Sequence, residues 1–181
     1  MKIIVSPFED CFLLKPQIIE DERGYFFESY NQQKFQQATN LSVNFVQDNQ
    51  SFSSYGVIRG LHSQVNEFAQ AKLVRVLQGE VLDVIVDARK GSATYGKSYS
   101  VRLSAENKLQ LFVPRGFYHG FAVLSKTAEF FYKCDNFYDR ESERGIYYAD
   151  PALNIDWMIE EESRIIADKD LALPHFSENG I

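Results

Sequence analysis

The side chains best suited to proton transfer near neutral pH are the three histidines, His62, His119 and His175. An imidazole titrates close to neutral pH, so it can act as a general base or a general acid. His62 lies in Arg-Gly-Leu-His-Ser-Gln and His119 lies in Pro-Arg-Gly-Phe-Tyr-His-Gly-Phe. His175 lies in a Pro-His-Phe near the C-terminus and is interpreted as a surface residue. His62 and His119 are therefore the candidates for chemistry.

Several common reaction types lack their sequence motifs here. The chain contains no G-x-x-x-x-G-K-[ST], no G-x-G-x-x-G, no H-E-x-x-H, no C-x-x-C and no G-x-S-x-G. The first three motifs serve P-loop nucleotide binding, dinucleotide binding and zinc-dependent hydrolysis. These classes of protein are disfavoured.

Composition predicts a globular protein with one domain spanning residues 1–181. The chain has a mass of 20.9 kDa, 45% hydrophobic residues and a mean hydropathy of −0.29. Its 19 Lys plus Arg against 25 Asp plus Glu give a net charge of −6. This balance argues against nucleic-acid binding, which uses clustered basic residues, and the hydropathy argues against a membrane span. A small anionic ligand held by a few cations stays open.

Two cysteines, Cys11 and Cys134, are too few for a disulfide framework or a zinc ribbon. We expect both thiols to be reduced and buried. The first residues, 1–12, contain Pro7, Glu9 and Asp10, which interrupt any apolar run of the signal-peptide type. A cytoplasmic protein is the simplest expectation.

The elements that must position the histidines are mostly strands. Runs of β-branched and apolar residues at 72–77, 80–87 and 98–103 predict strands, and turn-like segments at 89–92, 104–108 and 114–116 separate such runs. Helices are predicted only at 31–38 and 160–167. The pattern predicts a mainly β fold, either a sandwich or a barrel.

The surroundings of the two histidines resemble the motifs of the cupin superfamily, which are small double-sheet jelly rolls. His119 ends a Pro-x-Gly-x-x-His, and Gly56 and Gly79 flank the other motif. The resemblance implies a cupin-type double-stranded β-helix, or jelly roll, with short peripheral helices. Where a metal-binding cupin has a second histidine this chain has Gln64, and at the ligating glutamate it has Lys72. An ammonium group cannot ligate a divalent metal, so no metal is predicted.

A closer resemblance covers most of the chain, from residue 23 to residue 170. R-G-Y-F, Q-D-N, R-G-L-H, A-Q-A-K-L-V-R-V, P-R-G-F-Y-H-G-F, Y-K-C, E-R-G-I, D-P-A-L and D-K-D follow one another in the order found in dTDP-4-dehydrorhamnose 3,5-epimerases. The resemblance implies a cofactor-independent isomerase, usually a homodimer. It would convert dTDP-4-dehydro-6-deoxy-D-glucose to dTDP-4-dehydro-L-rhamnose in dTDP-L-rhamnose biosynthesis.

That reaction fits the chemistry of the residues. The C3 and C5 protons of the sugar are both next to the C4 ketone, so a base can remove each to give an enolate, and reprotonation from the other face inverts the carbon. The resemblance implies that His62 is the base and that Asp170 pairs with it. It also implies that Tyr132 is the acid, and we assign Lys72 the role of stabilising the enolate.

Strand alternation supports two of these roles. Tyr132 shares a face with Phe130 and Cys134, so it is expected to point to the interior. Lys72 shares a face with Val74, and an inward lysine is costly unless it meets an anion.

Further residues match substrate contacts of the family, and we predict that they bind the nucleotide sugar: Arg23, Glu28, Gln47, Asn49, Arg59, His119, Tyr138, Glu143 and Lys169. The guanidinium of an arginine can bind phosphate through two hydrogen bonds. The amides of Gln47 and Asn49 share a strand face and can hydrogen-bond polar groups of the ligand. The resemblance gives Tyr138 the role of stacking on thymine. Strict alternation puts Arg59 on the opposite face from His62. Both can line one cavity only if the chain bends, and Gly60 permits a bulge there.

Two departures from the family leave alternatives open. Ser63 follows His62 where the family commonly has an aromatic residue, and residues 65–68 replace a proline-rich loop. A single-site epimerase acting at C3 or C5 is one alternative. A sugar 3,4-ketoisomerase is a more distant relative, and a nucleotide-sugar-binding cupin without activity is the alternative from another class.

Overall fold

The runs of β-branched and aliphatic residues in the sequence form strands, as predicted. The computed structural model describes residues 1–176. Its strands β7 (Lys72–Gln78), β8 (Glu80–Asp87) and β9 (Ser98–Ser104) cover the three predicted ranges. Gly79, with φ of +77°, forms the tight connection between the first two, because only glycine adopts this conformation without strain.

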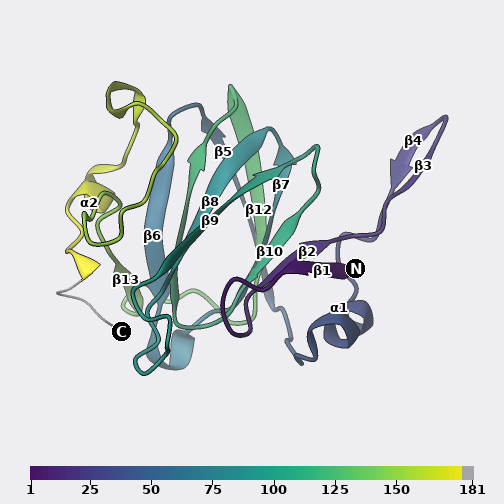
Figure 1. Ribbon diagram of the computed structural model, residues 1–181, viewed down its shortest axis with the longest axis horizontal. Helices are drawn as coiled ribbons and strands as arrows, with labels where there is room; N and C mark the ends of the chain where they lie inside the picture. Colours follow the sequence, from purple (N-terminus) through teal and green to yellow (C-terminus); the bar gives the residue numbers. More distant parts are fainter. Residues whose placement is uncertain (177–181) are drawn as a thin grey trace.

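Two antiparallel sheets face each other and make up most of the molecule (Figure 1). One has the order β1-β2-β10-β7-β12-β5, and the other has the order β13-β6-β11-β8-β9. The other strands of these two sheets are β1 (Lys2–Val5), β2 (Phe12–Lys15), β5 (Gln47–Ser54), β6 (Ile58–Gln64), β10 (Gln110–Val113), β11 (Phe117–Val123), β12 (Thr127–Cys134) and β13 (Glu143–Gly145). The mainly β, cupin-like jelly roll predicted from the sequence is confirmed.

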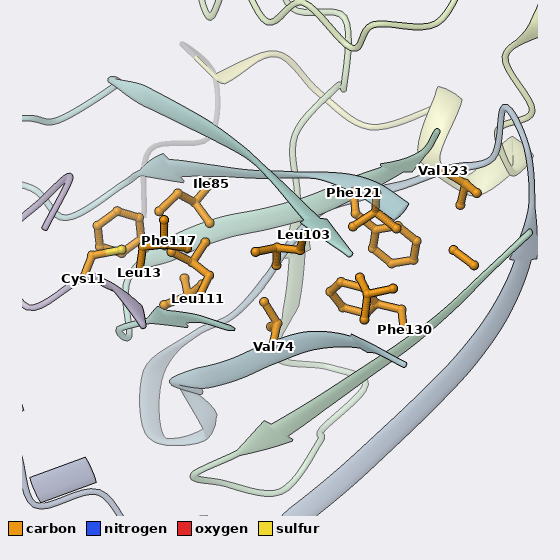
Figure 2. Packing of buried hydrophobic residues seen from close by; sticks show 14 of the residues in the cluster. Cys11, Leu13, Val74, Ile85, Leu103, Leu111, Phe117, Phe121, Val123 and Phe130 are labelled. Atoms are coloured by element: carbon orange, nitrogen blue, oxygen red, sulfur yellow. The ribbon is translucent and has the colours of Figure 1, made fainter. Parts of the chain in front are cut away.

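The main core lies between the two sheets (Figure 2). Val74 and Leu111 of the six-stranded sheet pack with Ile85 and Leu103 of the five-stranded sheet, and all four are fully buried. At one end of this core the rings of Phe121 (β11) and Phe130 (β12) stack across the gap, with centroids 4.2 Å apart. This packing fixes the separation of the sheets, and therefore of any side chains that meet between them.

The outer face of each sheet is partly covered. Helix α1 (Gln32–Thr39) buries Phe35 against the six-stranded sheet, and its start is capped by Asn31, whose side chain accepts from the Lys34 N–H. Residues 146–176 wrap the outer face of the five-stranded sheet, where Trp157 is buried. Helix α1 confirms the helix predicted at 31–38.

Cys11 and Cys134 are free and buried, as predicted.

The predicted helix at 160–167 is wrong. Only the 3₁₀ turn η2 (Glu161–Ser163) is helical in that range, and the short helix α2 (Asp168–Leu171) begins after it. Ile165 is extended between them because it bridges to Val57 of the sandwich, with its N–H donating to the Gly56 carbonyl at 2.9 Å. Tertiary pairing of a β-branched residue overrides the local helical pattern.

A two-stranded hairpin projects from the body of the molecule (Figure 1). It consists of β3 (Ile19–Asp21) and β4 (Gly24–Phe26), whose residues are all exposed. A second 3₁₀ turn, η1 (Asn66–Phe68), follows β6. Within residues 1–176, no helix has the length and apolar character needed to span a bilayer.

Candidate active site

Most of the predicted site residues meet in one cavity of about 580 Å³. Strands of both sheets and α2 line it, so residues far apart in sequence are brought together by the sandwich. The predicted residues in its lining are Arg59, His62, Lys72, His119, Tyr132, Tyr138, Glu143, Lys169 and Asp170. An adjoining space of about 240 Å³ adds Gln47 and Asn49, and it shares His62, Lys72 and Tyr132 with the larger cavity.

His62 and Asp170 form a hydrogen-bonded pair, as predicted. The Nε2 atom of His62 lies 2.8 Å from Oδ1 of Asp170, whose side chain is 3% exposed. Burial alone would raise the pKa of Asp170, but the hydrogen bond from His62 and a weaker one from the Gly60 N–H lower the pKa below its usual range. The carboxylate accepts the proton on Nε2, so it leaves Nδ1 of the neutral ring with a free lone pair for use as a base.

Glu143 lies on the other side of the imidazole. Its Oε1 is 3.8 Å from Nδ1 of His62 and 3.9 Å from Nζ of Lys169, and its Oε2 accepts from the Tyr138 hydroxyl at 3.0 Å. A carboxylate there stabilises the imidazolium that forms when His62 takes up a proton. Glu143 thus joins the base to residues predicted to bind the nucleotide sugar.

Tyr132 points to the interior from β12, as strand alternation predicts. Its ring packs on Phe130, with centroids 6.0 Å apart. Burial raises the pKa of Tyr132 to about 12, so the phenol stays protonated and able to donate at neutral pH.

Lys72 also points inward and lies next to Tyr132, with Nζ 5.8 Å from the ring centroid. Burial lowers the pKa of Lys72, and the nearby Cys134, Asp83 and Glu143 offset this only in part. Within residues 1–176, no carboxylate lies within ion-pair distance of its Nζ. A desolvated cation in this position favours an anion that enters the cavity.

A bulge in β6 lets Arg59 and His62 line the same cavity. His119 of β11 is opposite His62 and Phe121 is opposite Arg59, so two residues of β6 face the single Gly120 between them. Gly60 has φ of +111°, and a Cβ there would lie 2.6 Å from the Gly120 Cα. The bend predicted at Gly60 is confirmed.

His119 is paired with a carboxylate that the sequence analysis missed. Its Nε2 lies 2.9 Å from Oδ2 of Asp83, and both side chains are buried. Oδ1 of Asp83 has no hydrogen-bond partner among residues 1–176. The signal in the sequence was a carboxylate in the middle of the apolar strand 80–87, because buried charges are rare unless they are paired.

Arg23 and Glu28 line neither of these spaces. Arg23 lies on the projecting hairpin with its side chain 84% exposed, and it pairs with Asp21. Glu28 lines a separate small cavity near the N-terminus, where it forms an ion pair with Lys34. In a single chain, neither Arg23 nor Glu28 lines the site that contains His62.

Gln64 is buried at the end of β6, and its Oε1 accepts from the Asp139 N–H at 3.1 Å. His175 is exposed at the surface, as predicted, and lies 3.4 Å from Asp150. No cluster of three His, Cys, Asp or Glu side chains that could hold a metal is found within residues 1–176.

The sandwich and its cavity define a cupin-type jelly roll equipped for acid–base chemistry. The sequence matches the family described as dTDP-4-dehydrorhamnose 3,5-epimerase over residues 6–178. An enzyme of that name from Shigella flexneri is 50% identical over 171 residues, which are 94% of this chain and 93% of that protein.

Among the solved structures that match, two illustrate the similarity in both fold and sequence. dTDP-4-dehydrorhamnose 3,5-epimerase from Elizabethkingia anophelis superposes with a TM-score of 0.96 at 55% identity, covering 100% of this chain and 99% of that one. dTDP-6-deoxy-D-glucose-3,5-epimerase from Legionella pneumophila, in complex with dTDP-4-keto-L-rhamnose, superposes with a TM-score of 0.93 at 45% identity. The match covers 97% of this chain and 93% of that one. The chain belongs to the dTDP-4-dehydrorhamnose 3,5-epimerase family, whose members are isomerases.

Proposed function

We propose that the chain converts dTDP-4-dehydro-6-deoxy-D-glucose to dTDP-4-dehydro-L-rhamnose by inverting C3 and C5. The observation that carries this proposal is the placement of base and acid. His62 enters the cavity from the five-stranded sheet, and Tyr132 enters it from the facing six-stranded sheet. A sugar ring bound between them has a base on one face and a proton donor on the other, which is what inversion requires.

Each inversion has two steps in this proposal. Nδ1 of His62 takes the proton from the carbon next to the ketone, and the electron pair moves to the C4 oxygen to give an enolate. The Lys72 ammonium stabilises the enolate oxygen, and Tyr132 then returns a proton to the carbon from the opposite face. His62 then gives its proton to solvent and Tyr132 takes one from solvent, so that the second carbon can react in the same way. Asp170 and Glu143 stabilise the imidazolium between the steps.

The rest of the cavity serves the nucleotide in this proposal. Arg59 and Lys169 supply positive charge for the diphosphate, and Tyr138 stacks on the base. Its side chain is 52% exposed at the edge of the site, so its ring face is available. The amides of Gln47 and Asn49 line the adjoining space, where they can bind polar groups of the ligand.

We propose that this chemistry needs neither a metal nor a redox cofactor. The support is the residue set, because Lys72 and Gln64 replace ligands of metal-binding cupins and an enolate can be stabilised by an ammonium group. Activity should survive exhaustive chelation. A loss that one divalent ion restores would refute this point.

We also propose a homodimer in the cytoplasm. The support for the dimer is that Arg23 and Glu28, both predicted to bind substrate, line neither of the two spaces that contain His62 of their own chain. The hairpin that carries Arg23 also exposes Tyr25 (59%) and Phe26 (66%), and such apolar side chains suit burial against a second copy. Free cysteines fit the reducing cytoplasm.

Incubation of the purified protein with dTDP-4-dehydro-6-deoxy-D-glucose in deuterium oxide tests the function. Mass and proton spectra of the recovered sugar should show two deuterons, at C3 and C5. One deuteron would indicate a single-site epimerase and point to the region of Ser63. Binding without any incorporation would favour a nucleotide-sugar-binding protein.

A further inference from the structure

The loop between β12 and β13, residues 135–142, carries Tyr138 but is weakly held by packing. Phe137 is 61% exposed and Tyr138 is 52% exposed, so neither ring anchors the loop in a core. Backbone hydrogen bonds fix its ends, at Asp135 to Ala71 (3.1 Å) and at Ser142 to Val65 (3.0 Å). Asn136 is held by Gln70 and Glu67, and the Tyr138 hydroxyl donates to Glu143, but the backbone at Tyr138 needs partners of its own.

Two glutamines hold the middle of the loop. Oε1 of Gln47 accepts from the Tyr138 N–H at 3.1 Å, and Oε1 of Gln64 accepts from the Asp139 N–H at 3.1 Å. Gln47 begins β5 in the six-stranded sheet, and Gln64 ends β6 in the five-stranded sheet. One side chain from each sheet therefore accepts a hydrogen bond from one of two consecutive backbone N–H groups, those of Tyr138 and Asp139.

Of the two glutamines, Gln64 is the more firmly fixed because it is buried. It is 5% exposed, so water cannot replace its oxygen if the amide is removed, and the Asp139 N–H would lose its acceptor. It also lies two residues after His62, on the same face of β6. One strand thus positions both the base and the loop that carries Tyr138.

We propose that Gln64 is a positioning residue for nucleotide binding, which holds Tyr138 over the cavity through the Asp139 N–H. The proposal rests on the proposed function, because it takes Tyr138 as the residue that stacks on the nucleobase. Gln64 occupies the position where a metal-binding cupin has a second histidine. In this chain, that position acts on the nucleotide end of the site.

The Gln64 hydrogen bond contacts no residue of the reacting pair, and the loop reaches the base only through the Tyr138 hydroxyl on Glu143. The His62–Asp170 pair does not involve the loop, because Asp170 lies on α2. Loss of the Gln64 hold should therefore weaken nucleotide binding and raise KM, and leave kcat within about twofold. A residue that only supports the fold would not act through Tyr138.

A double-mutant cycle tests the proposal with dTDP as the ligand, measured by calorimetry. Gln64→Met keeps the length of the side chain and removes the acceptor, and it should bind dTDP about tenfold more weakly. Tyr138→Ala should show a similar loss, and the double variant should bind no more weakly than Tyr138→Ala alone. Gln50→Met, a matched change on an exposed residue of β5, should bind like the wild type.

Gln64→Glu keeps an oxygen acceptor and should retain dTDP affinity within about threefold, which gives a second test if Gln64→Met does not fold. Unchanged binding by Gln64→Met, losses that multiply in the double variant, or a Gln64→Glu loss as large as that of Gln64→Met would each overturn the proposal. If the wild type does not bind dTDP at all, the proposed function fails, and this inference fails with it.

Discussion

His62 and Tyr132 differ in the environment that each needs. The imidazole is oriented by two carboxylates, those of Asp170 and Glu143, whereas the phenol lies among apolar side chains of the core. The first environment stabilises a positive charge, and the second keeps a proton on oxygen. One residue is therefore suited to accept protons and the other to donate them.

Tyr132→Phe separates the two roles. The variant keeps the base, so His62 should still exchange the C3 and C5 protons of the substrate with solvent deuterium. Inversion should fall by about 10²–10⁴-fold, because no donor lies on the opposite face. Proton spectra taken during turnover measure both quantities. Loss of exchange together with inversion would show that Tyr132 is needed before the enolate forms.

The Asp170 pair should make the protein sensitive to acid. Because the pKa of Asp170 is lower in the folded chain than in the unfolded one, the unfolded state binds more protons as the pH falls. The stabilisation is present above about pH 4, the usual range of an aspartate, and is lost below it.

Urea unfolding at pH 6 and pH 3 measures this effect. The free energy of unfolding should fall less between the two pH values in Asp170→Asn than in the wild type. Asp168→Asn, a matched change at an exposed position two residues earlier, should follow the wild type. Equal falls in all three proteins would contradict the role of Asp170 in stability.

At the scale of elements, the bulge in β6 decides which side chains share the cavity. A regular strand would turn Arg59 away from His62. The close approach of Gly60 to Gly120 gives the strand its bend, and a side chain at residue 60 would occupy the space of the neighbouring strand.

Gly60→Ala should destabilise the protein by at least about 2 kcal/mol, because it combines a strained φ with a backbone clash. Gly91→Ala is the control, since Gly91 also has a positive φ of +89° but a Cβ there meets no atom within 4 Å. It should cost about 1 kcal/mol. Thermal unfolding measures both losses of stability. Equal losses in the two variants would show that the close approach of Gly60 to Gly120 does not contribute to the cost.

The sequence predicted the parts of the structure that depend on local pattern. Apolar alternation placed Tyr132 and Lys72 correctly, and the motif spacing identified the cavity. The failures involve contacts between distant segments. Ile165 is extended because it pairs with Val57, and the hold of Gln64 on the loop depends on how β6 meets residues 135–142. No local pattern carries that information.

At the scale of the whole molecule, the two sheets hold base and acid apart at a separation fixed by the core between them. The hairpin of β3 and β4 lies outside this arrangement, although Arg23 on it is predicted to bind substrate (Figure 1). A second copy of the chain would resolve this if its hairpin reached the cavity.

Mixed dimers test this arrangement. His62→Asn and Arg23→Ala proteins should each have low activity, and mixing them after subunit exchange should restore activity. The restored site would combine His62 of one chain with Arg23 of the other. Sedimentation should give about twice the chain mass of 20.9 kDa. Absence of restoration between exchanging subunits would show that each site uses its own Arg23.

The central claim is that a single base, His62, removes both protons. It is tested most directly by His62→Asn incubated with dTDP-4-dehydro-6-deoxy-D-glucose in deuterium oxide, with dTDP affinity measured on the same sample. We predict no deuterium at C3 or C5 and an affinity close to that of the wild type. Undiminished incorporation at either carbon would contradict the claim.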